Sequence, residues 1–97
     1  MTTHPKPVTI SVAAAEFGRD MEQGYATIAA LLEESRNRGS QLLVLPEAGL
    51  GGYLPSLGGG DETEESRQRR LKALPPALEL DGPEIRRAIH MAGDTVI

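Results

Sequence analysis

One carboxylate in the sequence occupies a position that suits chemistry. Glu47 follows a short apolar run, Leu42–Leu45, and a proline, Pro46. An apolar run of this length bounded by turn residues is typical of a buried strand in an α/β sheet, and proline ends the strand because it has no N–H to donate. Working residues of α/β proteins gather just past the carboxyl ends of such strands. Glu47 is therefore the first candidate for a catalytic residue.

The neighbours of Glu47 favour a role as general base. The rigid Pro46 precedes it, and small residues follow from Ala48 to Gly52, so another segment or a substrate can approach the turn closely. Burial of the carboxylate beside the apolar strand would strengthen its hold on a proton and make it better suited to act as a general base. The alternative is a structural role, in which Glu47 accepts hydrogen bonds from nearby backbone amides.

Other familiar sites are excluded by the residues present. Leu54 stands where both a dinucleotide-binding fingerprint and a nucleophile elbow around Ser56 would need glycine, and no glycine–lysine pair provides a phosphate-binding loop. The sequence has no cysteine, and therefore no disulfide, thiolate nucleophile or zinc–cysteine site. The two histidines, His4 and His90, lack partners at metal-ligand spacing, and we expect His90 to be solvated. We therefore expect neither a metal nor a cofactor.

The composition is that of an ordinary soluble protein with one domain. The chain has 97 residues, 39% hydrophobic and 25% charged, and its net charge of −4 argues against nucleic acid or an acidic membrane as a partner. The basic run Arg67–Arg70 follows an acidic run without interleaved aromatics, so we expect it to be solvated and self-paired. No apolar run is long enough to cross a bilayer, and residues 1–10 lack the apolar core of a secretory signal. A cytoplasmic location is the default expectation.

The elements that position Glu47 are predicted to be a strand, a helix and a second strand. The first strand spans Val8–Ala15, with alternating apolar residues at its start. The helix spans Met21–Arg38, because Asp20 is a good N-cap and Gly39 is a typical C′ residue. The strand Leu42–Leu45 follows directly, so the three form a βαβ unit with parallel strands and a right-handed crossover. The predicted apolar face of the helix comprises Tyr25, Ile28, Ala29 and Leu32.

The remainder of the chain is predicted to contain a linker and another well-formed helix. Residues 1–7 form a frayed lead-in, and residues 58–76 form a flexible, charged and proline-rich connection, within which residues 61–72 have the pattern of a short exposed helix. The next helix begins in the segment Asp81–Glu84, with proline near its first turn, and ends at Gly93. Its predicted buried face comprises Ile85, Ala88, Ile89 and Ala92.

Residues Thr95–Ile97 have the pattern of the beginning of a third strand. Because the preceding helix has an apolar face that needs a sheet, we expect the chain to be cut short within this strand. The alternative is that the segment is a complete short edge strand.

Residues 43–53, LVLPEAGLGGY, resemble the first catalytic segment of the nitrilase (carbon–nitrogen hydrolase) superfamily, in which an apolar strand runs into Pro-Glu and a Gly-Tyr follows. The opening strand and helix resemble the family's N-terminal βαβ unit, and Leu80–Glu84 resembles the start of its next helix. The match is weakest over residues 58–76. The resemblance implies an α/β fold in which residues 1–97 are the N-terminal part of an α-β-β-α sandwich: a βαβ unit, a further helix and the start of a third strand.

The resemblance also implies a chemistry. The family cleaves a nitrile or amide C–N bond with Glu, Lys and Cys: the thiolate attacks carbon, the glutamate moves protons and the lysine stabilises developing negative charge. Carried over to this sequence, only Glu47 has a counterpart, as general base and acid. Tyr53 matches the family's Gly-Tyr and would help to shape the substrate pocket, or else serves as a packing aromatic. Lys6 and Lys72 lie in the wrong segments to replace the lysine, and without a cysteine this chain alone is expected to be inactive.

Three interpretations remain. In the first, the chain is part of an amidase or nitrilase that acts on a small molecule, needs no cofactor and pairs its subunits, as the family commonly does. In the second, it is a non-catalytic α/β binding module, a degenerate short relative that binds a partner through its unfinished sheet. In the third, it is a small unrelated α/β domain in which Glu47 is structural. The coding sequence after Ile97 would separate the first two.

Overall fold

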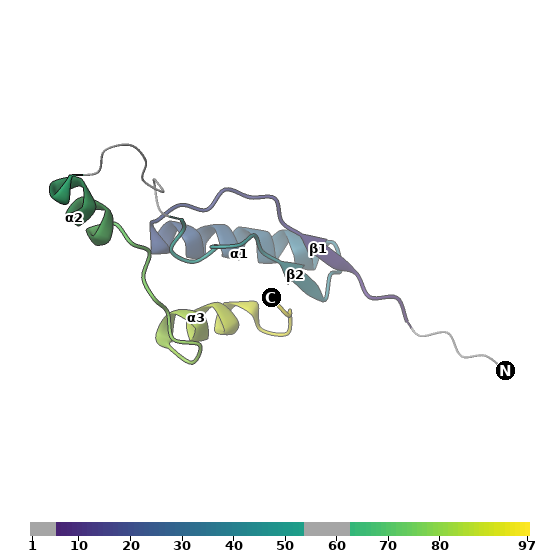
Figure 1. Ribbon diagram of the computed structural model, residues 1–97. Coiled ribbons are helices and arrows are strands. Elements are labelled where there is room, and N and C mark those ends of the chain that lie inside the picture. The colour runs from purple at the N-terminus through teal and green to yellow at the C-terminus, as the bar shows by residue number, and fades with distance from the viewer. Residues whose placement is uncertain (1–5, 54–62) are drawn as a thin grey trace.

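The computed structural model describes residues 6–53 and 63–97 (Figure 1). The elements in chain order are β1 (Ile10–Val12), α1 (Met21–Asn37), β2 (Leu42–Val44), α2 (Glu64–Lys72) and α3 (Pro83–Ala92). Helices and strands mix along the chain, which confirms the predicted α/β class. Within the two described ranges, no helix has the length and apolar character needed to cross a bilayer. The predictions for His4, Ser56 and residues 58–62 lie outside the described residues.

Helix α1 forms where its capping residues predict. The Asp20 carboxylate accepts a hydrogen bond from the Gln23 N–H at 3.1 Å, which satisfies one of the free amides at the start of the helix. The helix ends at Asn37, and Gly39 follows with a φ of +75°, as expected for a left-handed C′ residue. Ala29, which was assigned to the apolar face, is exposed because it lies at the edge of the buried stripe. That stripe comprises Tyr25, Ile28, Leu32 and Ser35.

Strands β1 and β2 pair in parallel, with Val12 opposite Val44. Both are shorter than the predicted strands Val8–Ala15 and Leu42–Leu45. The last backbone hydrogen bond between them runs from the Ala13 N–H to the Val44 carbonyl at 2.9 Å. Beyond that point the segments that follow β1 and β2 separate, because Pro46 has no N–H to continue the pairing of the second segment.

A third chain segment pairs with the other edge of β2. The Leu43 N–H donates to the Val96 carbonyl at 2.8 Å, and a parallel bridge joins Leu42 to Val96. The segment Thr95–Ile97 therefore begins a third strand, as predicted. This places β2 in the centre of the sheet, between β1 and Val96.

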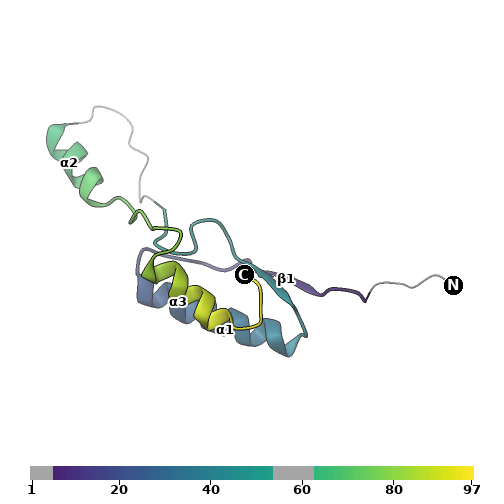
Figure 2. The same ribbon diagram turned by 90° about the horizontal axis from the view of Figure 1, so that it is seen from below.

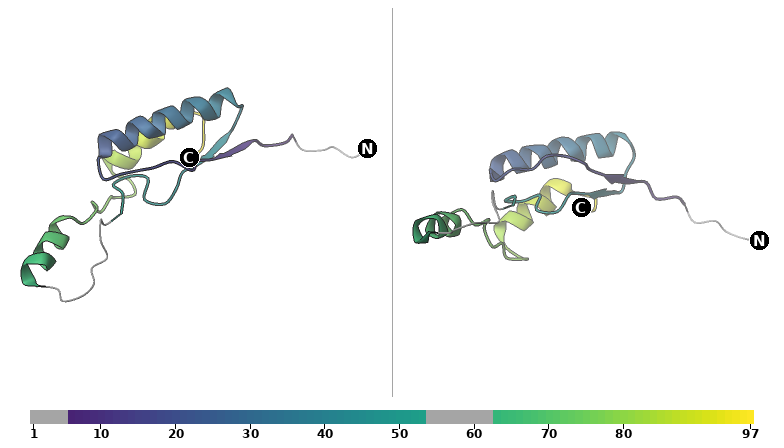
Figure 3. Two further views of the ribbon diagram at one scale, coloured as in Figure 1. Left: turned by 90° about the horizontal axis from the view of Figure 1, so that it is seen from above. Right: turned by 45° about the horizontal axis from the view of Figure 1, so that its top comes forward.

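Helices α1 and α3 lie side by side on one face of the sheet (Figures 2 and 3). The described residues therefore supply one helix layer and one sheet layer. Apolar side chains fill the space between the layers, and removing their surface from water favours the folded state. The fully packed members of this core are Ile28, Leu32, Leu43 and Ala92.

Helix α1 holds both ends of α3. At the start of α3, the Tyr25 hydroxyl donates to the Glu84 carbonyl at 3.0 Å. At its end, Arg36 donates to the Met91 and Ala92 carbonyls at 3.0 and 2.7 Å. A guanidinium at a helix C-terminus satisfies carbonyls that have no partner in the helix and suits the negative end of its dipole.

An ion pair adds to this interface near its solvent edge. Arg87 of α3 donates to both carboxylate oxygens of Glu22 in α1, at 2.6 and 2.9 Å, and its guanidinium lies 3.8 Å from the centre of the Tyr25 ring. The hydrogen bond from Arg87 lowers the pKa of Glu22. Burial raises the pKa of Tyr25 above its ordinary value of 10.0.

One flank of α3 is less covered than predicted. Ala88 and Ala92 are buried, but Ile89 is 60% exposed, so its assignment to the buried face is wrong. Ile89 lines an apolar hollow of about 460 Å³, together with Leu50 and Ile97. The described sheet is too narrow to cover this flank, because only one bridge of its third strand is formed.

The sheet face opposite the helices is apolar and has no described helix over it (Figure 3). Successive side chains of a strand alternate between its two faces, so this face carries every second residue. A sheet face of this kind is what an α-β-β-α sandwich would place against its second sheet. The exposed apolar residues of this face are Ile10, Val12, Val44 and Val96.

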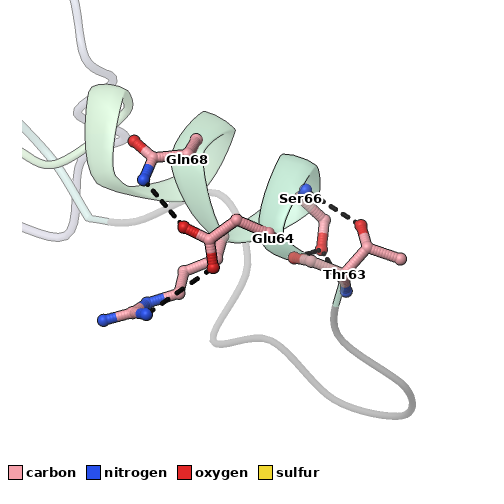
Figure 4. Close-up of polar contacts among 5 residues, drawn as sticks. Thr63, Glu64, Ser66 and Gln68 are labelled. Carbon is pink, nitrogen blue, oxygen red and sulfur yellow. Dashed lines mark hydrogen bonds and ion pairs between the residues drawn. The ribbon is translucent and has the colours of Figure 1, made fainter.

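Helix α2 stands apart from the other elements and has no buried residue (Figure 1). Thr63 and Ser66 form a reciprocal capping box at its start (Figure 4). Glu64 accepts a hydrogen bond from Gln68 at 3.0 Å and pairs with Arg67 at 3.7 Å. The short exposed helix predicted in this segment is confirmed, and Arg67 pairs within it as expected.

Candidate active site

Glu47 lies just past the carboxyl end of the central strand. Strand β2 ends at Val44, Leu45 and Pro46 carry the chain beyond the sheet, and residues 47–51 form a turn. The structure thus places Glu47 where the sequence predicts it. A side chain here is held by a buried strand on one side and is open to other loops on the other.

The backbone of this turn is unusual at Ala48. Among the described residues other than glycine, Ala48 alone has a positive φ, at +58°. A side chain in this left-handed region costs on the order of 1 kcal/mol or more. The turn is closed by a hydrogen bond from the Gly52 N–H to the Ala48 carbonyl at 3.2 Å. Contacts around the turn therefore fix the direction in which Glu47 leaves it.

A glycine contact joins the turn to the loop before α1. Gly52 has a φ of +70°, and an added Cβ atom there would lie 2.8 Å from the Gly18 carbonyl oxygen. Only glycine fits such a backbone approach. Gly24 in the first turn of α1 also lies beside the turn, and a Cβ atom added there would make an ordinary van der Waals contact, at 3.4 Å, with the Gly49 carbonyl oxygen. The close approach expected from the small residues therefore occurs, and the approaching segment belongs to this chain.

Tyr53 and Glu47 are joined across the turn. The Tyr53 hydroxyl donates to Oε2 of Glu47 at 2.7 Å. Glu47 is exposed and Tyr53 is 60% exposed. Burial of the Glu47 carboxylate is therefore not found in the described chain, although Leu50 of the same turn packs against the core. The two residues that sequence analysis singled out are nevertheless brought together.

The Glu47 carboxylate strengthens the hold of Tyr53 on its proton. The hydrogen bond to Glu47 is the main cause that raises the pKa of Tyr53 above its ordinary value of 10.0, and partial burial and the charge of Glu47 act in the same direction. Tyr53 therefore carries its proton at neutral pH and acts as a donor. Its backbone is also held, since Arg19 Nη1 lies 3.5 Å from the Tyr53 carbonyl oxygen.

The described site can move a proton but has no nucleophile. The sequence contains no cysteine. Lys6 precedes β1 and therefore lies at the amino ends of the parallel strands, whereas Glu47 follows their carboxyl ends. Lys72 is the last residue of the separate helix α2. Within residues 6–53 and 63–97, no group of His, Asp and Glu side chains could hold a metal ion.

Some residues that shape the site were not predicted individually. The turn is positioned by Gly18, Arg19 and Ala48. None of the three forms a described hydrogen bond with Glu47. The adjacent glycines at 51 and 52 were a usable signal of close approach. Gly18 gave none, because its contact is with a segment distant in the sequence.

Comparison with known proteins relates the sequence to one enzyme family. The carbon–nitrogen hydrolase family matches residues 9–97. Nitrilase 2 of Arabidopsis thaliana is 38% identical over 64 residues, which cover 62% of this chain and 19% of that protein. A bifunctional nitrilase/nitrile hydratase of Oryza sativa subsp. japonica is 35% identical over 71 residues, which cover 65% of this chain and 20% of that protein.

The chain thus spans about a fifth of the length of these curated relatives. No solved structure matches it significantly. The family match covers β1, the Glu47 turn, Tyr53 and α3 together, which is most of the chain. The chain belongs to the carbon–nitrogen hydrolase family.

Proposed function

We propose that Glu47 is the general base and acid of a carbon–nitrogen hydrolase that cleaves a nitrile or an amide, and that the lysine and cysteine acting with it lie outside this chain. The observation that carries the proposal is the position of Glu47. It stands at the carboxyl end of the central strand, exposed, within the residues that the family matches.

The proposed chemistry begins with Glu47 as a base. The carboxylate accepts the proton of a cysteine thiol, and the thiolate attacks the nitrile or amide carbon. Protonated Glu47 then returns the proton to the substrate nitrogen. With an amide, the C–N bond breaks at this step, ammonia or an amine leaves, and a thioester remains on the cysteine. With a nitrile, the first product is a thioimidate, to which one water molecule adds with Glu47 moving its protons, so that ammonia leaves and the same thioester remains. In the second half, Glu47 takes a proton from a further water molecule, the hydroxide attacks the thioester carbon and the C–S bond breaks, which releases the acid and the thiolate, and Glu47 returns the proton to the sulfur. A lysine ammonium stabilises the negative charge that develops in both halves.

The names of the relatives support a small-molecule substrate with a nitrile group. An amide remains within the proposal, because both substrates present an electrophilic carbon bonded to nitrogen. We extend the proposal to a protein that pairs its subunits and uses no cofactor.

The first test is the coding sequence that follows Ile97. The proposal expects it to continue in frame to a lysine and then a cysteine, each after a further strand. A stop codon directly after Ile97 would contradict the proposal for this gene.

The second test is Glu47→Gln in the full-length product. Removing a general base lowers turnover by about 10²–10⁴-fold. We expect this loss for nitrile or amide hydrolysis, with an unchanged far-UV circular dichroism spectrum. Glu33→Gln is the matched control, because Glu33 is an exposed glutamate on α1. Equal activity of the two variants would exclude the catalytic role.

One observation favours a second candidate, a non-catalytic binding module. The sheet face opposite the helices exposes Ile10, Val12 and Val44, and a face of this kind marks an interaction surface when nothing within the protein covers it. The same coding sequence separates the two candidates. Further strands after Ile97 would provide the cover, whereas a stop codon would leave the face to a partner.

A further inference from the structure

We propose that Tyr53 is a positioning residue for Glu47: its hydroxyl holds one carboxylate oxygen and leaves the other free to exchange protons with the reacting groups. The inference rests on the proposed function of Glu47 as a general base. It assigns Tyr53 a role different from shaping the substrate pocket.

The geometry of the contact suits this role. The Tyr53 hydroxyl donates to Oε2 of Glu47 at 2.7 Å, a length typical of a hydrogen bond to an ionised acceptor. A glutamate side chain can rotate about each of its single bonds, so its carboxylate has no fixed direction by itself. A general base, however, must direct one lone pair of its carboxylate at the proton that it accepts. A bond to Oε2 removes much of that freedom and leaves Oε1 for proton transfer.

A donor can position its acceptor only if the donor is itself held. Tyr53 follows Gly52, whose backbone fits against Gly18 so closely that no other residue could take its place. The turn between the two partners is closed by the bond from the Gly52 N–H to Ala48, and Arg19 lies 3.5 Å from the Tyr53 carbonyl oxygen. Tyr53 is therefore anchored to the loop before α1 as well as to the turn.

The direction of the proton is also fixed. A phenol with its ordinary pKa of 10.0 carries its proton at neutral pH, so Tyr53 is the donor, and the hydrogen bond to Glu47 raises that pKa further. With its hydroxyl committed to Glu47, Tyr53 has no second proton to offer to a substrate.

The first experiment measures the contact without any activity assay. The chain has two tyrosines, Tyr25 and Tyr53, so ¹³Cζ-labelled tyrosine gives two resolved titrations by NMR. Glu47→Gln removes the negative charge and the strong acceptor. We expect it to lower the pKa of Tyr53 towards 10 and to leave that of Tyr25, which bonds to Glu84, unchanged. An unchanged Tyr53 titration would overturn the proposal.

The second experiment uses the full-length protein. Tyr53→Phe keeps the ring and removes the donor. We expect kcat to fall by about 10–100-fold, as for the loss of one hydrogen bond to a charged group, with KM within about twofold of wild type. A pocket-shaping role would move KM instead, and either that result or a wild-type kcat would overturn the proposal.

The double variant Glu47→Gln/Tyr53→Phe tests whether the residues act as one unit. We expect it to be no slower than Glu47→Gln alone, because Tyr53 has no base left to position. Additive losses would overturn the positioning role. If Glu47→Gln retains wild-type turnover, the proposed function fails and the positioning role with it. If Glu47→Gln is inactive and Tyr53→Phe is fully active, only the positioning role fails.

Discussion

The α1–α3 interface and the Glu47 turn are held by different means. The interface depends on side chains: buried apolar groups beneath the helices, Arg36 on the end of α3, and the Arg87–Glu22 pair at the edge. The turn depends on backbone: Gly52 against Gly18, a left-handed Ala48 and one closing hydrogen bond. The first region sets the stability of the chain, and the second sets where one carboxylate points.

The difference explains how each region should respond to substitution. A buried side chain contributes free energy through its whole surface, so its loss weakens the entire chain. The contact of Gly52 with Gly18 buries little surface and so contributes little to the free energy of unfolding. No residue larger than glycine fits at position 52, so a single added methyl group there displaces the turn. Stability and site geometry should therefore be separable by mutation.

The largest effect on stability is expected at Ile28, which has no exposed surface and lies in the core beneath the helices. Ile28→Ala should lower the free energy of unfolding by about 2–5 kcal/mol, because it removes buried surface and leaves a cavity. Urea denaturation followed by circular dichroism measures the change. Should the alanine variant fail to fold, Ile28→Val, with an expected loss of about 1 kcal/mol, gives the same comparison.

The control for this prediction is Ile89 of α3, the isoleucine that proved to be 60% exposed. Ile89→Ala should change the free energy of unfolding by no more than about 0.5 kcal/mol. Equal losses at Ile28 and Ile89 would mean that the hollow beside α3 is closed in solution.

A smaller effect on stability, but a larger one on the site, is expected for Gly52→Ala. The new methyl group would sit 2.8 Å from the Gly18 carbonyl oxygen at a φ of +70°. The strain is of order 1–3 kcal/mol, and the turn can relieve part of it by moving. We expect Tyr53 to lose its contact with Glu47, so that its pKa falls towards 10 in the ¹³Cζ titration.

Gly18→Ala tests the other side of the same contact. No atom lies within 4 Å of a Cβ added at Gly18. This variant should therefore keep both the stability and the Tyr53 titration of the wild-type chain. If Gly52→Ala also kept them, the close approach of the two backbones would not be what holds the turn.

The parts of the fold that were predicted well are those set by local sequence. Asp20 and Gly39 fix the ends of α1 because capping involves residues within one turn. Pro46 fixes the end of β2 and hence the position of Glu47 for the same reason. Position at the end of a strand is a local property, so it could be predicted.

The features that the sequence did not predict depend on which other segments pack against a helix, strand or turn. Helical spacing predicts which residues share a stripe, but the width of the neighbouring sheet decides whether Ile89 at its edge is covered. The exposure of Glu47 likewise depends on other loops. The contact between Gly18 and Gly52 joins segments far apart in the sequence, and no local pattern announces it.

The smallest effect is expected at the Arg87–Glu22 pair, which is exposed and therefore screened by solvent. The hydrogen bond from Arg87 lowers the pKa of folded Glu22 below its ordinary value of 4.5. A carboxyl with a lowered folded pKa stabilises the chain above its unfolded pKa, and this stabilisation is lost as the pH falls through the folded value. Glu22→Gln should therefore be less stable than wild type at pH 7, and the difference should vanish in strong acid. Unfolding free energies measured across this pH range, with Glu33→Gln as control, test the prediction. A difference that stays constant with pH would show that Glu22 acts through packing and not through its charge, and the strength of the side-chain interface would then rest on its apolar contacts and on the hydrogen bonds of Tyr25 and Arg36.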